Sequence, residues 1–305
     1  MNLAMYNGRK SLRLLPILIL PFVAMPVHAV CEGFHELLPF VPASGWPNGW
    51  QGFVRIENAF NRAESIRFTA TDDAGYSYSQ EVEVGAQQSL HFNSEDLEFG
   101  NDAKGGLQGV GTAPVGHWRL CFTDLLFAKV GAYIRTSDGL VTDMTLVIEG
   151  DNSLCEVECP EWRVPIFNPA SNRNQVSFLR IVNNSDLHKP LYIFGVREDG
   201  VTNRDANGDA LGVAGFLPAR EAVEITSSQL ETGVGIRLDR CNPSDPSDCV
   251  TAIGSIGPAR GKWALFVHEL SNGPSEELVV MNLMRTPTGH VTNLSAGGND
   301  TWIRR

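Results

Sequence analysis

The hydrophobic and polar positions of this chain alternate over short runs, with the spacing of β-strands. In 53–58, the side chains of Phe53, Arg55 and Glu57 share one face of an extended backbone, and Val54 and Ile56 share the other. Glycine and aspartate turn signals separate such runs, and long helical periods are almost absent. We therefore predict an all-β protein built from antiparallel sandwiches. The expected strands and extended entry segments are 37–44, 53–58, 65–71, 76–84, 89–92, 118–123, 130–136, 140–148, 164–171, 178–183, 191–196, 222–225, 263–268, 278–285 and 290–294.

Three short motifs occur twice, which indicates an internal duplication. An acidic motif at 94–100 returns at 227–233, a Gly-x-Trp motif at 116–120 returns at 261–265, and an Arg-Thr turn at 135–139 returns at 285–289. The spacing between the copies grows along the chain, so the second copy carries loop insertions, including 203–212. We predict two tandem immunoglobulin-like antiparallel β-sandwich domains after a signal peptide. The predicted parts are a signal peptide at 1–29, a first domain at 30–150, a linker at 151–161 and a second domain at 162–305.

The acidic motif of each copy predicts one helical turn. Ser94 or Ser228 can cap the turn, and Glu231 follows Ser228 by three residues, as in a capping box. Leucines at 97 and 230 are expected to pack inward, and glycines at 100 and 233 to end the turn with positive φ.

The first copy is similar to a known repeat unit along most of its length. Its run His91-Phe-Asn-Ser-Glu-Asp-Leu-Glu-Phe-Gly-Asn, then Gly-His-Trp-Arg-Leu and Tyr133-Ile-Arg-Thr-Ser-Asp-Gly-Leu, resembles a tandem repeat module of secreted bacterial proteins. The second copy departs from that pattern at Ala264, where the first copy has arginine. That family has no established activity, so the resemblance implies secretion and an all-β module and assigns no catalytic residue.

The N-terminus predicts export. Arg9, Lys10 and Arg13 precede an apolar run at 14–24, and small residues follow before a cleavage point after Ala29. The run is too short and too rich in proline to span a membrane, so we expect a secreted or periplasmic protein with no membrane span in the mature chain. Cleavage removes three of the 24 basic residues and no acidic one, which changes the net charge from −11 to about −14. Such an acidic surface argues against nucleic-acid partners.

Six cysteines behind a signal peptide favour disulfides. Cys241 and Cys249 bracket a polar, turn-rich loop, so we predict that they pair with each other. The other four allow three connectivities, among which we favour Cys31–Cys121 with Cys155–Cys159. Zinc is disfavoured because no second thiol or histidine pair at ligand spacing accompanies Cys155 and Cys159.

Residue types kept in both copies are expected to be framework. We predict structural ion pairs, with Glu98 held by Arg55 or Arg135, and a core tryptophan in each copy. The alternative is that the arginines and glutamates form an acid/base or anion site. These repeated residues are Arg55, Glu98, Trp118 and Arg135 in the first copy and Arg180, Glu231, Trp263 and Arg285 in the second.

Two features occur in one copy alone and could bind a ligand. Trp46 and Trp50 lie in a Gly/Pro loop, where they could stack on sugar rings or instead cover the end of the core or the seam between domains. Asp205, Asn207 and Asp209 have the spacing of a calcium-binding loop but lack the glycine and glutamate that complete one, so calcium is the one cofactor considered.

No catalytic motif is complete in the sequence. There is no Gly-x-Ser-x-Gly elbow, and neither His-Glu pair completes a zinc-protease motif. We therefore expect a secreted, non-enzymatic binding, adhesion or structural module, with a protein or glycan partner at the cell exterior. The alternatives are a carbohydrate-binding protein that uses Trp46 and Trp50 and a cryptic hydrolase whose residues meet only in space.

Overall fold

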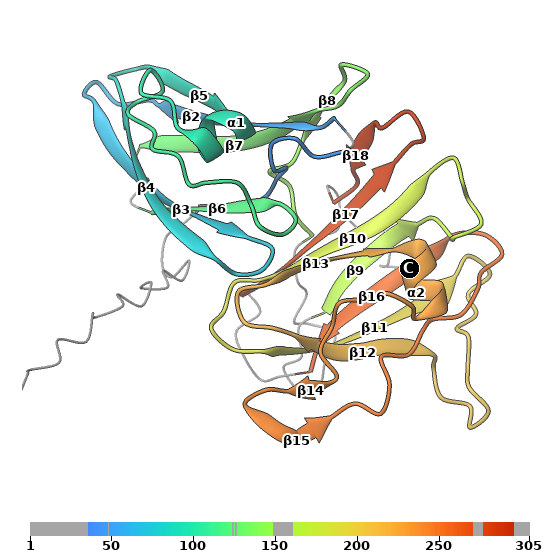
Figure 1. The fold of residues 1–305 in the computed structure, drawn as a ribbon. Coiled ribbons are helices and arrows are strands. Elements are labelled where there is room, and N and C mark those ends of the chain that lie inside the picture. Colours follow the sequence, from blue (N-terminus) through green and yellow to red (C-terminus); the bar gives the residue numbers. More distant parts are fainter. Residues whose placement is uncertain are drawn as a thin grey trace, which may run out of the picture.

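The computed structural model describes residues 36–47, 49–123, 125, 127–148, 161–270 and 277–295. These residues form antiparallel β-sheets with two single-turn helices, which confirms the predicted all-β class (Figure 1). The predicted signal peptide and almost all of the predicted linker lie outside the described residues. Among the described residues, no helix is both long and apolar enough to cross a membrane.

The first half of the structure, residues 36–148, consists of two four-stranded sheets. In order, one contains β1 (Glu36–Val41), β6 (Trp118–Thr123), β3 (Glu64–Asp72) and β4 (Ser77–Val84). The other contains β5 (Ser89–Asn93), β2 (Gln51–Asn58), β7 (Ala128–Arg135) and β8 (Val141–Asp143). Residues from both sheets meet in one hydrophobic core that includes Phe40, Ile56, Phe68 and Trp118.

The second half, residues 161–295, repeats this strand order. One sheet contains β9 (Glu161–Phe167), β16 (Trp263–Glu269), β11 (Lys189–Arg197) and β12 (Gly212–Leu217). The other contains β13 (Ala222–Thr226), β10 (Val176–Asn183), β17 (Leu278–Arg285) and β18 (Val291–Asn293). An additional hairpin, β14 (Cys241–Asn242) and β15 (Asp245–Cys249), lies between β13 and β16 in the sequence.

Both halves share two strand pairings with immunoglobulin sandwiches and differ in two others. The pairs β2–β5 and β3–β6 correspond to the B–E and C–F pairs of that fold. However, β1 pairs with β6 and β7 pairs with β2, so the outer strands are exchanged between the sheets. The second half has the same arrangement in β9–β16 and β17–β10.

Each acidic motif forms one helical turn, α1 (Ser94–Phe99) and α2 (Ser227–Thr232). The caps lie earlier than predicted: Asn93 with Asp96, and Thr226 with Gln229, form the capping boxes in place of Ser94 and Ser228. The glycines after the turns have positive φ, 82° and 73°, as expected.

The two halves contact each other through one sheet face of the second half. Strand β2 is buried on alternate residues, whereas its equivalent β10 is buried along nearly its whole length. The reason is that Phe178, Met281, Leu283 and Val291 point away from the second half's own core and join the core of the first half. In Figure 1 this sheet, with β10, β13 and β17, faces the first half.

Candidate functional site

The main group of buried charged side chains lies at the seam between the halves. Asp73 follows β3, His117 and Arg119 lie at the start of β6, Arg180 lies in the middle of β10, and Glu224 lies in β13. Four of the five are buried, and the Glu224 side chain keeps 29% of its surface exposed. We call these five residues the seam cluster.

Arg180 binds the first half through all of its guanidinium nitrogens. Its Nη2 and Nη1 donate to the two carboxylate oxygens of Asp73 at 2.6 and 3.1 Å, and Nε donates to the Pro39 carbonyl at 3.0 Å. The guanidinium carbon lies 4.8 Å from the centre of the Phe40 ring. Nη1 also lies 3.4 Å from Glu224 Oε1, within the second half. This bidentate geometry is the strong form of an arginine–carboxylate pair.

Asp73 makes hydrogen bonds to both halves besides its pair with Arg180. Its Oδ2 accepts from the His117 main-chain N–H at 2.9 Å, and its carbonyl accepts from the Ala222 N–H of the second half at 3.1 Å. A Cβ on Gly116 would lie only 2.0 Å from Asp73 Oδ2, so this approach of the carboxylate requires glycine there. The turn therefore presents both the main chain and the side chain of Asp73 to the second half.

His117 and Glu224 have strongly shifted pKa values because they are desolvated. Burial lowers the pKa of His117 to about 3; nearby Asp73 raises it and Arg180 lowers it further. Burial raises the pKa of Glu224 to about 7, against the lowering effect of Arg180 and Arg285. His117 is therefore neutral at pH 7, and the 3.5 Å approach of its Nε2 to Glu224 is not an ion pair.

Arg119 ties the seam together from β6. Its Nη1 donates to the Asp72 carbonyl at 3.2 Å, and its Nη2 donates to the Arg220 carbonyl of the second half. Burial lowers its pKa to about 10, which leaves it charged at neutral pH. Arg220 has a positive φ of 61°, so its carbonyl is presented from a strained turn.

The two tryptophans proposed as a sugar platform are part of this seam. Trp50 is 4% exposed, and its indole N–H donates to the Gly289 carbonyl at 2.8 Å. Trp46 is partly buried, and its ring lies 4.2 Å from that of His117. Phe40 packs edge-on against His117 at 4.7 Å. Trp50 is thus not available to a sugar, because its ring is buried beside Phe40 and His117 and its N–H is bonded to the second half.

His117 and Asp73 are suited to fixing the two halves rather than to acid–base chemistry. A general base works best with a pKa near the operating pH and must reach its substrate, and His117 meets neither condition. Asp73 is occupied by two guanidinium bonds. Among the described residues, no group of three or more His, Cys, Asp and Glu could hold a metal ion.

Glu98 and Glu231 bind indole groups. Oε1 of Glu98 accepts from Trp118 Nε1 at 2.8 Å, and Ser44 donates both its N–H and its hydroxyl to the same carboxylate. Oε1 of Glu231 accepts from Trp263 Nε1 at 2.9 Å. Trp118 and Trp263 are almost completely buried, so the contact satisfies a buried N–H in each half, and in the first half it also satisfies the buried Glu98 carboxylate.

The ion pair predicted between Glu98 and Arg55 or Arg135 is wrong. Arg55 points outward and pairs with Glu57 at 3.2 Å, while Arg135 donates to Gln51 at 2.6 Å. The physical reason is the pleat: both arginines lie on the outer face of their sheet, whereas α1 places Glu98 toward the core.

The calcium candidates form a tight turn. Asp205 Oδ1 accepts from the main-chain N–H groups of Asn207 and Asp209 at 2.8 and 2.9 Å. The carboxylate is therefore used within its own loop, and all three side chains are exposed.

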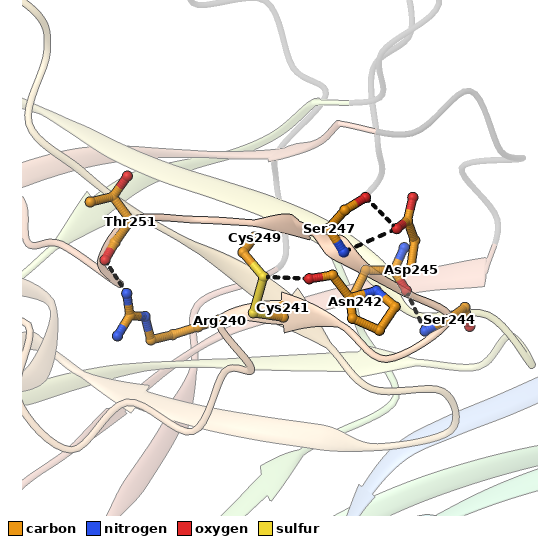
Figure 2. Close-up of a disulfide and its surroundings, with 9 residues drawn as sticks. Arg240, Cys241, Asn242, Ser244, Asp245, Ser247, Cys249 and Thr251 are labelled. Atoms are coloured by element: carbon orange, nitrogen blue, oxygen red, sulfur yellow. Dashed lines mark hydrogen bonds between the residues drawn. A yellow bond between two sulfur atoms is a disulfide. The ribbon is translucent and has the colours of Figure 1, made fainter.

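The predicted Cys241–Cys249 disulfide is present and closes the β14–β15 hairpin (Figure 2). Its loop is further held by Asp245, which accepts from Ser247, and by Arg240, which donates to the Thr251 carbonyl. Cys121 is also disulfide-bonded. The pairings predicted for Cys31, Cys155 and Cys159 lie outside the described residues.

One repeated pair was missed by the sequence analysis. Nδ2 of Asn58 donates to the carbonyls of Arg62, Val84 and Gly85, and Nδ2 of Asn183 makes the same three kinds of bond to Leu187, Leu217 and Pro218. The signal was an asparagine at the end of the same strand in both copies.

A second buried ion cluster lies within the second half. Lys189 Nζ lies 2.8 Å from Glu269 and 2.7 Å from Glu277, and the Lys189 and Glu269 side chains are buried. Desolvation lowers the pKa of Lys189, but the two carboxylates outweigh it and the net shift is upward. This cluster joins β11, β16 and β17 and has no counterpart predicted from the sequence.

No protein-family model matches this chain, and no curated protein is similar to it in sequence. A crystal structure described as that of a "putative secreted protein" from Parabacteroides distasonis is 7% identical and covers 72% of this chain and 74% of its own, with a TM-score of 0.17. A TM-score of this size does not show a common fold.

Proposed function

We propose that the chain is a secreted, non-enzymatic structural or adhesion module in which two duplicated sandwich units act as one rigid body. The duplication is supported by the equal strand order of the halves and by the equivalent Glu98–Trp118 and Glu231–Trp263 contacts. Disulfides at Cys121 and Cys241 are typical of an oxidising compartment, which agrees with an exported protein. The signal peptide at 1–29 remains part of this proposal.

The single observation that carries the proposal is the use of the seam cluster. Charged and aromatic residues that would have been candidates for chemistry are buried and bonded between the halves, with Arg180 anchored on Asp73 at 2.6 and 3.1 Å. Inter-domain contacts within a chain are by default mobile unless the interface is large and apolar. Here apolar side chains of the second half complete the core of the first, so the halves are expected to stay in one orientation.

Small-angle X-ray scattering of the mature chain tests the proposal. The expected profile is that of one rigid particle, unchanged between about 0.1 and 1 M salt, because buried pairs are screened far less than exposed ones. A profile that requires an ensemble of inter-domain orientations would contradict it. A hydrolase panel and a glycan array on the same sample separate it from the enzyme and from the carbohydrate-binding protein, for which turnover or specific retention is expected.

A further inference from the structure

The seam joins two different surfaces, one from each half. Because the halves have the same strand order, each half also has the equivalent of the surface that the other half contributes, and this equivalent surface is not part of the seam. The second half contributes the outer face of β13–β10–β17, and the first half contributes β1, the turn after β3 and the start of β6. The outer face of β5–β2–β7 in the first half is the counterpart of the first surface. The counterpart of the first half's seam surface is one end of the second half, formed by β9, the turn after β11 and the start of β16.

The face left open on the first half has the same backbone frame as the docked face. Arg55 lies opposite His91 in β5, as Arg180 lies opposite Glu224 in β13. Among the described residues, two that are not glycine have positive φ: Gln87 (53°) and Arg220 (61°). Each precedes one of these equivalent strands, β5 or β13, by two residues. Arg220, whose carbonyl accepts from Arg119 in the seam, therefore has an exposed counterpart in the first half, Gln87.

This open face also carries two half-buried aromatic side chains, one of which, Phe53, has the Arg135 guanidinium 5.4 Å from its ring centre. Phe53 and Tyr133 stack at 5.0 Å and 8°, at the positions where Phe178 and Leu283 pack into the seam. Arg55 is not committed to a buried partner: its side chain is 50% exposed and lies 3.2 Å from Glu57, which is 52% exposed. Pairs of this kind contribute about 0–1 kcal/mol, so exchanging the partner costs little.

The end left open on the second half repeats the acidic turn of the seam. Glu198 Oε2 accepts from the Lys262 main-chain N–H at 3.3 Å, as Asp73 Oδ2 accepts from His117. A Cβ on Gly261, the counterpart of Gly116, would lie 2.8 Å from Glu198 Oε2. The Glu198 carboxylate thus has the same position relative to its sheet as the Asp73 carboxylate has in the first half.

Elsewhere on that end, two described positions are more open than their counterparts in the seam. A Cβ on Gly75 would lie 3.1 Å from the Arg220 carbonyl across the seam, whereas a Cβ on Gly200, its counterpart, has nothing within 4 Å. Ile166 is 48% exposed, whereas Phe40, at the same place in β1, is completely buried under Arg180. Ile166 and Glu198 are therefore exposed at the place where the equivalent residues of the first half bind Arg180.

The geometry points to head-to-tail association of this chain, in which the end of the second half of one copy docks on the open face of another copy's first half. Glu198 then pairs with Arg55, as Asp73 pairs with Arg180 within the chain, and Ile166 packs beside Phe53. Such a contact joins unlike surfaces, so it builds a ring or an open chain of copies rather than a two-fold symmetric dimer. The inference is separate from the proposed function, because a monomeric chain could still be a rigid module.

Charge reversal tests it on the full mature chain. Sedimentation velocity over a concentration series is expected to show association of the wild type that weakens about tenfold or more in Arg55→Glu and in Glu198→Arg, because like charges then meet. An equimolar mixture of the two variants is expected to restore association, since each variant then offers the partner that the other lacks. Arg67→Glu is the matched control, because Arg67 is also a strand arginine, 67% exposed, and lies on the other sheet.

Three results would overturn the inference. One is a wild type that stays monomeric up to about 1 mM, the affinity at which a contact contributes only about 4 kcal/mol. Another is association that responds to Arg55→Glu no more than to Arg67→Glu. The last is a mixture of Arg55→Glu and Glu198→Arg that remains as dissociated as the separate variants. Circular dichroism of each variant checks that the fold is retained.

Discussion

The Asp73–Arg180 pair gives the sharpest test of the seam. Replacing Asp73 by alanine removes both guanidinium bonds, of 2.6 and 3.1 Å, and leaves the arginine buried with Pro39 and Glu224 as its nearest acceptors. Removing one partner of a buried pair costs about 3–5 kcal/mol. Glu224 at 3.4 Å compensates part of the charge, so we expect a loss of about 3 kcal/mol, at the lower end of that range.

Differential scanning calorimetry at pH 7 measures this loss. At about 2–4 °C per kcal/mol for a unit of this size, Asp73→Ala is expected to lower Tm by about 6–12 °C. Glu198→Ala is the matched control, because Glu198 occupies the same place in the second half but is exposed, and it is expected to change stability by less than about 0.5 kcal/mol.

A double-mutant cycle separates the pair from general disruption. Arg180→Met removes the buried charge while keeping apolar volume, so Asp73→Ala in that background is expected to cost at least about 2 kcal/mol less than in the wild type. Equal costs in the two backgrounds, or a Tm of Asp73→Ala within about 2 °C of the Glu198→Ala control, would refute the argument that the pair holds the seam.

Three further predictions concern other parts of the structure. Glu98→Gln, which keeps the shape but removes the charge from the indole contact, is expected to lower the unfolding free energy by about 1–2 kcal/mol in urea, and an unchanged midpoint would contradict it. The folded-state pKa of Glu224 is about 7, above its ordinary 4.5, so the contribution of Glu224 to stability is lost as pH rises through 7. The folded-state pKa of His117 is about 3, below its ordinary 6.5, so the contribution of His117 is lost as pH falls from 6.5. The two oppose each other between pH 4.5 and 6.5, so Tm of Glu224→Gln should fall more steeply on acidification than that of the wild type, and parallel curves would exclude this coupling. Replacing Cys241 and Cys249 by serine is expected to cost about 2 kcal/mol, with faster proteolysis at the loop, and equal proteolysis rates would argue against the constraint.

Local patterns predicted the strands and turns because those depend on short-range chemistry. Alternation along 53–58 gave the correct inner and outer faces of β2, and the glycines that follow α1 and α2 end those turns with positive φ. The Cys241–Cys249 pair followed from a short polar loop that a bond would close. The caps were placed too late because serine, asparagine and threonine are all good N-caps and occur side by side here.

Contacts between distant segments could not be read from the same patterns. Arg55 and Arg180 are the same residue type at equivalent strand positions, yet one is half exposed and the other completely buried. What separates them is docking of the second half, which depends on surfaces more than 100 residues apart in the chain. Equal residues at equivalent positions of the two halves therefore indicated an equal backbone, as for Asn58 and Asn183, but not an equal environment.

The pairing of Asp73 with an arginine that lies later in the chain bears on the order of folding. All strands of the first half precede residue 148, whereas the guanidinium that neutralises Asp73 arrives only with β10. Units of a chain generally fold as they emerge, N-terminal first. The first half therefore completes its sheets with the Phe40 ring and the Asp73 carboxylate still in water, and closing of the seam is the last step of folding. Trp50 fluorescence is expected to report this closure, because the indole N–H binds the Gly289 carbonyl of the second half, and the change should be absent in a chain that ends before β9.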